Sequence, residues 1–310
     1  MNYNPYGNLE KKASRISFGG WQLGNNEFWG EMSFQEGVNL VREAYENGIT
    51  LFDTAPGYAN GQSERIIGEA LKDVRDKVII NTKIGHKADG STDFSVESLE
   101  SQINESLIRL QTYYLDSVLL HNPSMDILSG KTDHFKELKR LKEKGLIKSY
   151  GVSIDTYSEL KTVIEKTDVQ VIEILFNIFF QEPGSLFMFV KLKKIALIAK
   201  VPLDSGWLTG KYDAYSKFDG IRSRWDSKTI ERRADLIKRI KTITNDDSLT
   251  KYAIGFILSY AGVTSVITGI KNSAQLLENI EAEKFVLDFK LKQSFIDIYN
   301  QQIKNKPLNW

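Results

Sequence analysis

Four polar residues near the ends of apolar runs could together carry proton transfer. Asp53 lies in the run TLFDT and Tyr58 follows it in the next turn, Lys83 lies in VIINTKI, and His121 closes SVLLH. A carboxylate keeps a nearby ammonium charged, and an ammonium favours ionisation of a phenol, whose ordinary pKa is about 10. We therefore expect Asp53 to hold Lys83 and Lys83 to lower the pKa of Tyr58. Tyr58 would then protonate a developing alkoxide while His121 orients the same oxygen.

Each of these side chains also has a structural explanation when taken alone. Asp53 could cap a turn, Lys83 could be solvated, Tyr58 could be a loop aromatic, and His121 could be a hydrogen-bonded core imidazole. Taken together they favour a site, because a buried Asp and Lys in apolar runs are costly unless they pair. Such a site protonates an oxyanion but contains no reductant, so we expect a hydride carrier from outside the chain.

Eight short apolar or β-branched runs, each followed by helical spacing, would position these residues. The runs begin at Arg15, Thr50, Val78, Ser117, Ser149, Glu173, Ala196 and Ser265. Eight strand–helix repeats predict an α/β protein closed into a (β/α)₈ TIM barrel, with polar strand ends at its mouth. An open doubly wound sheet is the alternative. No linker interrupts the pattern, so we expect a single domain over residues 1–310.

Two segments are not part of the eight strand–helix repeats. Residues 204–246 contain a Gly-bearing loop and a charged helix between the seventh and eighth strands. Insertions at this end of a barrel commonly belong to its site. The last residues, LDFKLKQSFIDIYNQQIKNKPLNW, predict a C-terminal helix.

Composition and charge exclude several classes of protein. The 41 basic and 40 acidic side chains leave a net charge of +1, so no charge surplus directs the chain to nucleic acid or a membrane surface. The absence of cysteine excludes disulfides, thiolate metal sites and cysteine nucleophiles. Only His121 stands clearly at a strand end as a metal ligand, which disfavours a metal-dependent hydrolase, and we expect no metal. With no apolar run of about 18 residues, we expect a soluble, cytoplasmic protein.

Several segments carry a resemblance to a known family. FDTAPGYANGQSERIIGEAL, NTKIG, LLHNP, GVS, VPLDSGWLTGKY and SVITGIKNSAQLLENI resemble, in order, the signature blocks of the aldo-keto reductases. The resemblance runs from RISFGGWQLG to about residue 282. It implies a TIM barrel that binds NADP(H) without a Rossmann domain, and a catalytic tetrad of Asp53, Tyr58, Lys83 and His121.

The resemblance also implies cofactor contacts. Ser153, Glu173 and Lys200 would surround the nicotinamide, although the family commonly has Gln and an aromatic residue where Glu173 and Lys200 stand, and Asn where Ile154 stands. We expect Glu173 and Lys200 to pair with each other. The loop over the pyrophosphate would supply Pro202, Leu203, Ser205, Gly206 and Leu208. The segment after the eighth strand would hold the phosphate and adenine end through Gly269, Lys271, Asn272, Gln275, Glu278 and Asn279.

Substrate recognition would fall to side chains around the mouth. Aromatic and imidazole side chains after the first and third strands and in the insertion are candidates, each of which could instead be packing: Trp21, Phe28, Trp29, His86 and Trp225. Arg222 and Arg224 could bind an anionic group or tie the insertion down, and His134 is expected to be solvated.

The function we expect is NADPH-dependent reduction of an aldehyde or ketone, with the reverse oxidation open to the same site. The alternative is a cofactor-binding regulatory or redox-sensing subunit of the same fold, as the potassium channel β subunits of the family suggest. The partner would be a small carbonyl or alcohol, and the protein a monomer or weak homo-oligomer.

Overall fold

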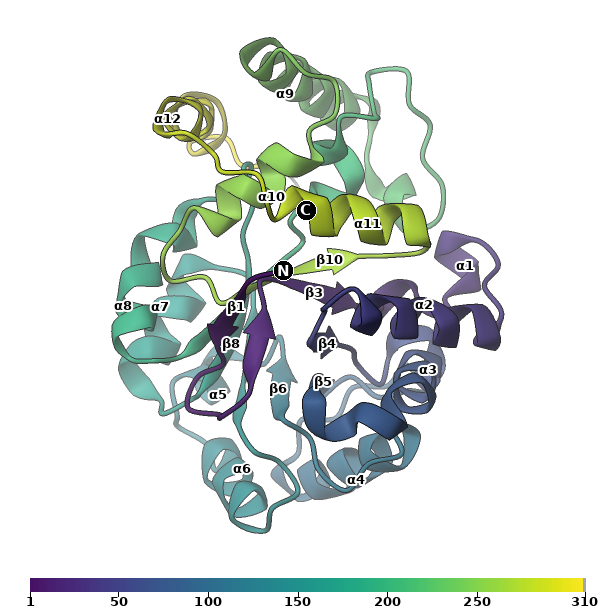
Figure 1. Ribbon diagram of the computed structural model, residues 1–310. Helices are drawn as coiled ribbons and strands as arrows, with labels where there is room; N and C mark the ends of the chain where they lie inside the picture. Colours follow the sequence, from purple (N-terminus) through teal and green to yellow (C-terminus); the bar gives the residue numbers. More distant parts are fainter. Residues whose placement is uncertain (309–310) are drawn as a thin grey trace.

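The computed structural model describes residues 1–308, with the side chain of Ile221 excepted, and its centre is a closed barrel of eight parallel strands (Figure 1). Around the barrel the strands follow the order β10, β3, β4, β5, β6, β7, β8, β9. Their bounds are β3 Ile16–Gly19, β4 Leu51–Asp53, β5 Ile79–Ile84, β6 Ser117–His121, β7 Tyr150–Ile154, β8 Val171–Leu175, β9 Ala196–Lys200 and β10 Ser265–Gly269. All eight predicted strands and the closed barrel are confirmed. The sixth begins at Val171 instead of Glu173, so Glu173 lies in mid-strand.

A helix follows each strand and packs outside the barrel (Figure 1). These helices are α2 Phe34–Glu46, α3 Gln62–Leu71, α4 Leu99–Arg109, α6 His134–Glu143, α7 Tyr157–Lys166, α8 Phe187–Leu192, α10 Thr250–Leu258 and α11 Ser273–Ala282. Capping interactions between neighbouring residues fix the first residues of several helices. At α2, the Ser33 hydroxyl accepts from the Glu36 N–H while the Glu36 carboxylate accepts from the Ser33 N–H, and Thr156 and Glu159 repeat this capping box at α7.

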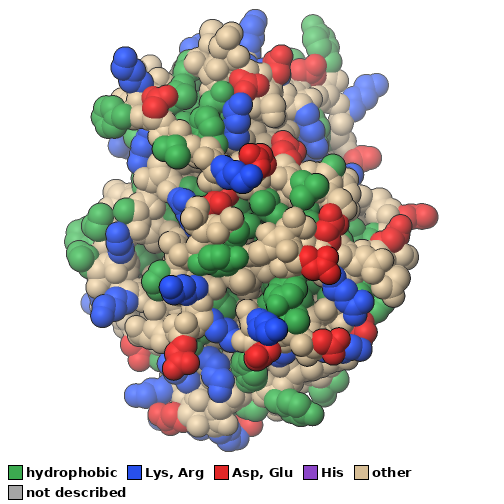
Figure 2. All heavy atoms as spheres, in the orientation of Figure 1, with side chains coloured by type: hydrophobic (Ala, Val, Ile, Leu, Met, Phe, Trp, Pro, Cys, Tyr) green, Lys and Arg blue, Asp and Glu red, His purple; other side chains and the backbone are tan. Residues whose placement is uncertain are grey.

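Shorter elements complete the connections. They are the helices α1 Asn26–Trp29 and α5 Met125–Leu128 and the 3₁₀ turns η1 Gly20–Gln22, η2 Tyr58–Gly61, η3 Lys72–Lys77, η4 Val96–Ser98, η5 Glu182–Leu186, η6 Asp204–Thr209 and η7 Gly220–Arg224. Among the described residues no helix has the length and apolar character to cross a membrane. Cationic and anionic side chains mix over the face drawn in Figure 2, as the near-zero net charge predicts.

The barrel interior is apolar at one end and polar at the other. Because successive strand side chains alternate between faces, residues two apart along a strand share the interior. An apolar layer fills the amino-terminal half: Tyr6, Ala13, Leu51, Ile79, Leu119, Val171, Ala196, Ile198 and Ile267. Moving two or four residues along the same strands brings Asp53 above Leu51 and Lys83 above Ile79. The alternation therefore carries polar side chains to the carboxyl-terminal mouth.

An antiparallel hairpin that was not among the predicted strands packs against the amino-terminal end of the barrel. It consists of β1 Tyr3–Pro5 and β2 Lys12–Ser14. The fully buried Tyr6 hydroxyl lies 2.7 Å from the Ser117 hydroxyl, at the first residue of β6. The hairpin thus helps to cover the end of the barrel opposite the predicted site.

The predicted insertion lies between β9 and β10 and contains η6, η7 and the long helix α9 Ser227–Thr244. A buried ion pair ties its two parts together, with Arg233 Nε of α9 3.0 Å from Asp204 Oδ2 of η6. The predicted C-terminal helix is α12 Phe289–Ile298, continued by the π-helical segment η8 Tyr299–Ile303. Both additions to the barrel are therefore confirmed.

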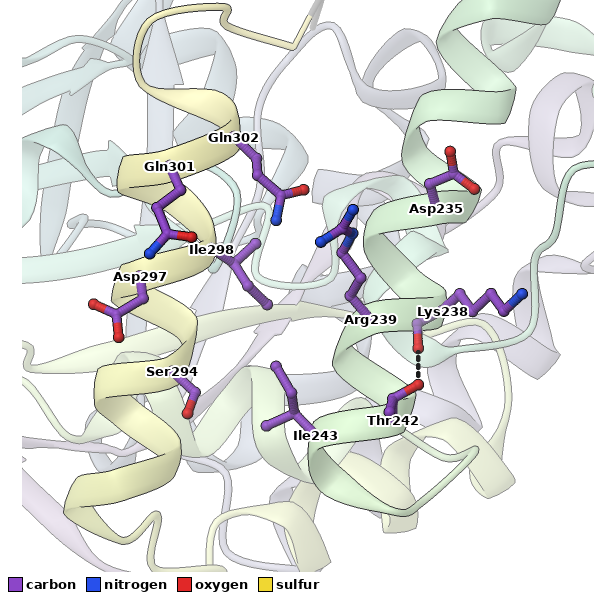
Figure 3. Close-up of a pocket in the computed structure, with 10 residues that line it drawn as sticks. All are labelled: Asp235, Lys238, Arg239, Thr242, Ile243, Ser294, Asp297, Ile298, Gln301 and Gln302. Carbon is purple, nitrogen blue, oxygen red and sulfur yellow. Dashed lines mark hydrogen bonds between the residues drawn. The ribbon is translucent and has the colours of Figure 1, made fainter.

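A surface groove of about 670 Å³ separates α9 from α12 and η8 (Figure 3). Arg239 of α9 and Gln302 of η8 point toward one another across it (Figure 3). None of the predicted site residues lines this groove, so the groove and the polar barrel mouth are separate features.

Candidate active site

Lys83 stands at the centre of the polar mouth and is completely buried. Its ammonium donates to both carboxylate oxygens of Asp53, at 2.8 and 2.6 Å, and to the Thr54 carbonyl at 3.1 Å. The Tyr58 hydroxyl lies 3.4 Å from the same nitrogen. Asn81 donates to Asp53 Oδ1 at 2.6 Å, which fixes the carboxylate from its other side. The structure thus brings the predicted carboxylate, ammonium and phenol into direct contact.

The turn that presents Tyr58 is conformationally unusual. Ala59 and Asn60 have φ values of 49° and 53°, in the left-handed region that side chains with a Cβ seldom adopt, and Gly61 follows at 82°. A left-handed alanine costs roughly 1–2 kcal/mol, so packing around the turn must hold it. The sequence APGYANG therefore forms a tight loop that returns Tyr58 over Lys83.

His121 ends β6 beside Tyr58, with the two ring centres 6.5 Å apart and nearly perpendicular. His86 lies on its other side at 5.1 Å, and its Nδ1 is 3.1 Å from the Thr92 hydroxyl. Burial, Lys83 and Lys200 keep the pKa of His121 well below its ordinary value, so the imidazole is neutral. Its buried Nδ1 has no hydrogen-bond partner among the described residues.

The expected lowering of the Tyr58 pKa is corrected by the structure. Burial raises the pKa of the Tyr58 hydroxyl above its ordinary value, and Asp53 and Glu173 add to the increase. Lys83 acts in the expected direction but does not outweigh desolvation. Without a bound ligand the phenol is therefore firmly protonated.

The expected ion pair between Glu173 and Lys200 is wrong. Lys200 Nζ instead lies 2.9 Å from Asp155 Oδ1 and donates to the Ser153 hydroxyl at 2.9 Å. The Ser153 hydroxyl in turn donates to Glu173 Oε1 at 3.0 Å, and Glu173 Oε2 lies 3.4 Å from Lys83 Nζ. The mid-strand position of Glu173 turns it into the barrel toward Lys83, while Lys200, at the end of β9, reaches the rim.

The loop after β9 places the residues predicted at the pyrophosphate in a run of left-handed conformations. Val201, Asp204, Ser205 and Gly206 have φ values of 56°, 44°, 54° and 100°. Pro202 and Leu208 are buried, whereas Leu203, Ser205 and Gly206 are half-buried. The buried Asp204–Arg233 pair anchors this loop from below. Ser205 and Gly206 therefore remain accessible on an irregular but fixed backbone.

The segment after β10 forms a helix start. The Asn272 side chain caps α11 by accepting from the Gln275 N–H at 2.9 Å, and Gln275 Oε1 accepts from the Lys271 N–H at 3.1 Å. Lys271 and Asn272 line a pocket of about 220 Å³ together with Gln22 and residues 29–32. Glu278 is exposed, and Asn279 is buried with its side-chain amide 3.5 Å from the Gly269 carbonyl.

Aromatic side chains of the first loop meet the insertion. Trp21 and Trp29 pack edge to face at 5.3 Å, and the Arg222 guanidinium lies 4.6 Å from the Trp29 ring centre. Phe28 is exposed. Arg222 thus connects the insertion to the first loop, one of the two roles expected of it.

Two expectations about exposure are corrected. Trp225 is only 6% exposed and packs inside the insertion against Trp207 and Phe218, at ring distances of 6.0 and 5.0 Å, so it is not an open wall of the mouth. His134 is buried and not solvated. Its Nδ1 lies 2.9 Å from the Thr132 hydroxyl, and its Nε2 donates to the Phe94 carbonyl at 2.6 Å.

Sequence reasoning missed two partners of the site. Asn81 precedes Lys83 by two residues, so strand alternation alone puts it on the same interior face. Asp155 follows β7 immediately. Nothing local indicates that Asp155 reaches Lys200. Within residues 1–308 no cluster of His, Asp and Glu could hold a metal ion.

A family model described as the Aldo/keto reductase family matches residues 15–295. The chain belongs to this family. The oxidoreductase YqkF of Bacillus subtilis (strain 168) is 27% identical over 288 residues, which span 91% of each chain. An NADH-specific methylglyoxal reductase of Escherichia coli (strain K12) is 26% identical over 307 residues, 91% of this chain and 93% of the relative.

The fold of this aldo/keto reductase family member matches solved structures as well. The holo form of the aldo-keto reductase AKR11C1 from Bacillus halodurans superimposes with a TM-score of 0.81 at 22% identity, covering 96% of both chains. Family membership makes this chain an oxidoreductase of small molecules. The assignment of individual residues depends on the geometry of the mouth.

Proposed function

We propose that this protein reduces an aldehyde or ketone to an alcohol with NADP(H), and that Tyr58 is the general acid. The contact that supports this most directly is the Tyr58 hydroxyl 3.4 Å from a lysine ammonium that Asp53 holds on both oxygens. A phenol over a fixed cation at a barrel mouth is suited to protonating an oxygen that gains charge.

The residues present fit a nicotinamide cofactor. Glu173 Oε2 is buried without a hydrogen-bond partner among the described residues, and an amide N–H would satisfy it. At the other end, the amino terminus of α11 with exposed Lys271 offers N–H groups and a positive charge suited to a phosphate. Ser153, Glu173 and Lys200 would hold the ring end, the 202–208 loop would cover the pyrophosphate, and residues 269–279 would hold the adenosine end.

The cofactor supplies the hydride when bound. Tyr58 donates its hydroxyl proton to the carbonyl oxygen as that oxygen becomes an alcohol, and the neutral His121 donates a hydrogen bond to the same oxygen. Lys83 stabilises the phenolate that remains, and Asp53 keeps Lys83 in place. Trp21, Phe28, Trp29 and His86 form the candidate walls of the substrate pocket. In the reverse direction Tyr58 would act as the base.

The test combines cofactor binding with turnover. We expect NADPH fluorescence to change on titration with the protein, and we expect NADPH oxidation with a panel of small aldehydes and ketones. Tyr58→Phe should lower kcat by about 10²-fold or more and leave NADPH affinity nearly unchanged, because only the proton donor is removed. If Tyr58→Phe keeps more than roughly a tenth of the wild-type kcat, Tyr58 is not the general acid.

The same experiment distinguishes a reductase from the alternative, a cofactor-binding regulatory subunit. A regulatory or redox-sensing subunit would bind NADPH with no appreciable turnover on any substrate of the panel.

We further propose that the protein acts in the cytoplasm on small molecules, as a monomer or weak homo-oligomer without nucleic acid. Light scattering at several protein concentrations tests the oligomeric state.

A further inference from the structure

Two buried carboxyl groups face one buried ammonium in the mouth. Lys83 is the cation; Asp53 contacts it at 2.6 Å and Glu173 at 3.4 Å. The three side chains are between 0 and 4% exposed. With both carboxyl groups ionised, the buried trio would carry an excess negative charge, which an interior accepts only at considerable cost.

Lys200 favours ionisation of Glu173 but offsets this excess only in part. The ammonium of Lys200 is already paired with Asp155 at the rim. His121 on β6 is neutral, and Tyr58 and Tyr6 keep their protons because burial raises the pKa of both hydroxyls. These are the titratable groups facing the pair from the surrounding strands, the η2 turn and the end of the hairpin.

Glu173 is less fully hydrogen-bonded than Asp53. Its Oε1 accepts from Ser153, but its buried Oε2 has no hydrogen-bond donor among the described residues, and 3.4 Å is long for an ammonium–carboxylate bond. The Asp53 and Glu173 carboxyl groups both contact the Lys83 ammonium, at 2.6 and 3.4 Å, and this shared cation brings them into contact with each other's charge. Two ionised carboxylates have no proton to share, so this contact is favourable only after proton uptake.

We propose that Asp53 and Glu173 share one proton across Lys83, and that Glu173 is thereby a positioning residue that sets the charge around Tyr58. The proton belongs to the pair, since ionisation of one carboxyl group opposes ionisation of the other. Burial and Glu173 raise the pKa of Asp53 to about 7 in spite of Lys83. Burial also opposes ionisation of Glu173, but Lys83, Lys200 and the contacts with Asp53 and Ser153 outweigh it and lower the Glu173 pKa.

The shared proton has a consequence for catalysis, and this part rests on the proposed function. When the pair releases its proton, the added negative charge stabilises the phenol form of Tyr58 against phenolate. Reduction needs the phenol and oxidation needs the phenolate. Glu173 therefore biases the site toward reduction above neutral pH.

The first test needs neither cofactor nor substrate. Infrared spectra of the protein are recorded across a pH series, following the C=O stretch of a protonated carboxyl group. We expect a band in the wild type that is lost near pH 7, where the pair titrates. In Glu173→Gln, Asp53 faces Lys83 alone, and the band should move to below about pH 5, toward the ordinary range of an aspartate.

A matched control uses another buried carboxylate. Glu64 is paired with Arg109 and accepts from Thr82, and the second carboxylate on Arg109, that of Glu105, is exposed, so Glu64→Gln should leave the band near pH 7 in place. A band near neutral pH that persists in Glu173→Gln would overturn the proposal, as would a wild type without such a band. If Glu173→Gln does not fold, the same infrared measurement on Ser153→Ala tests whether Glu173 belongs to the pair. Loss of the hydroxyl donor to Glu173 should raise the midpoint, and an unchanged midpoint removes Glu173 from the pair.

The second test addresses the catalytic consequence. The ratio of the oxidation to the reduction rate is measured against pH in both proteins. We expect this ratio to rise in Glu173→Gln above pH 7, with the wild-type inflection near that pH lost. If the infrared band behaves as expected and the ratio does not change, the shared proton exists without a catalytic role. A lack of turnover in the wild type would instead reject the proposed function and leave the infrared result standing.

Discussion

Lys200 pairs with Asp155, with 2.9 Å between Nζ and Oδ1, and so holds the end of β9 to the residue that follows β7. The pair sits at the rim, where the Lys200 side chain is 14% and the Asp155 side chain 37% exposed. Lys200 reaches Glu173 only through the Ser153 hydroxyl. The positive charge of Lys200 is therefore neutralised from the solvent side of the mouth.

A double-mutant cycle measures this rim pair. Because the pair is partly exposed, we expect Lys200→Met and Asp155→Asn to couple by only roughly 0.2–1 kcal/mol in urea unfolding. The same cycle for Lys200 and Glu173 should give a smaller value. A coupling above about 3 kcal/mol between Lys200 and Glu173 would be the signature of a buried direct pair and would contradict the observed arrangement.

Lys271 is expected to decide cofactor preference. A charge-assisted hydrogen bond to a 2′-phosphate contributes about 1.5–3 kcal/mol, so Lys271→Ala should weaken NADPH binding roughly 10- to 100-fold and leave NADH binding nearly unaltered. Fluorescence titration with both cofactors measures this. Lys238→Ala, in the groove between α9 and α12, is the control, because it removes an exposed lysine elsewhere. Equal affinities of the wild type for NADPH and NADH would remove the basis for the assignment.

The carboxyl pair makes stability depend on pH. The pKa of Asp53 is raised to about 7, whereas an unfolded aspartate titrates near ~3.9. Between these values the folded chain binds more protons than the unfolded chain, so the free energy of unfolding contributed by this group falls as pH rises and is lost through pH 7. Burial lowers the pKa of His121, so below the ordinary pKa of histidine the contribution of His121 to the free energy of unfolding rises with pH. This contribution is the same in wild type and in Glu173→Gln, and it cancels when the two proteins are compared.

We therefore expect the stability of Glu173→Gln relative to wild type to increase as pH rises from about 5 to 8. Denaturant unfolding at several pH values measures this difference. A difference that stays constant over the range would show that the pair does not titrate there.

The Asp204–Arg233 pair should be a strong anchor of the insertion. Both side chains are 0% exposed, so Asp204→Asn leaves a buried guanidinium without its counter-charge. The cost should be about 3–5 kcal/mol in unfolding free energy. Glu281→Gln removes one member of an exposed pair with Lys284 and should change stability by less than about 0.5 kcal/mol. Equal effects of the two substitutions would mean that Arg233 finds water or another partner.

The barrel and the polar cluster at its mouth could be predicted from the amino-acid sequence. Eight apolar or β-branched runs, each followed by helical spacing, predicted the strands, and Asp53, Lys83 and His121 stand near the ends of three of these runs. The order of strands in a parallel barrel follows chain order, and this brings consecutive strand ends together. Tyr58 followed from its position in the turn after β4.

Which charges pair and which groups are desolvated could not be predicted from local sequence and became evident from the folded molecule. Glu173 and Lys200 were expected to meet because their strands are neighbours, but a start two residues earlier in β8 places Glu173 deeper in the barrel, beside Lys83. Likewise, the sign of the Tyr58 pKa shift depends on burial by the whole mouth and not on Lys83 alone. Periodicity specifies the face on which a side chain lies, whereas ion pairing and desolvation depend on its depth and on contacts distant in the chain.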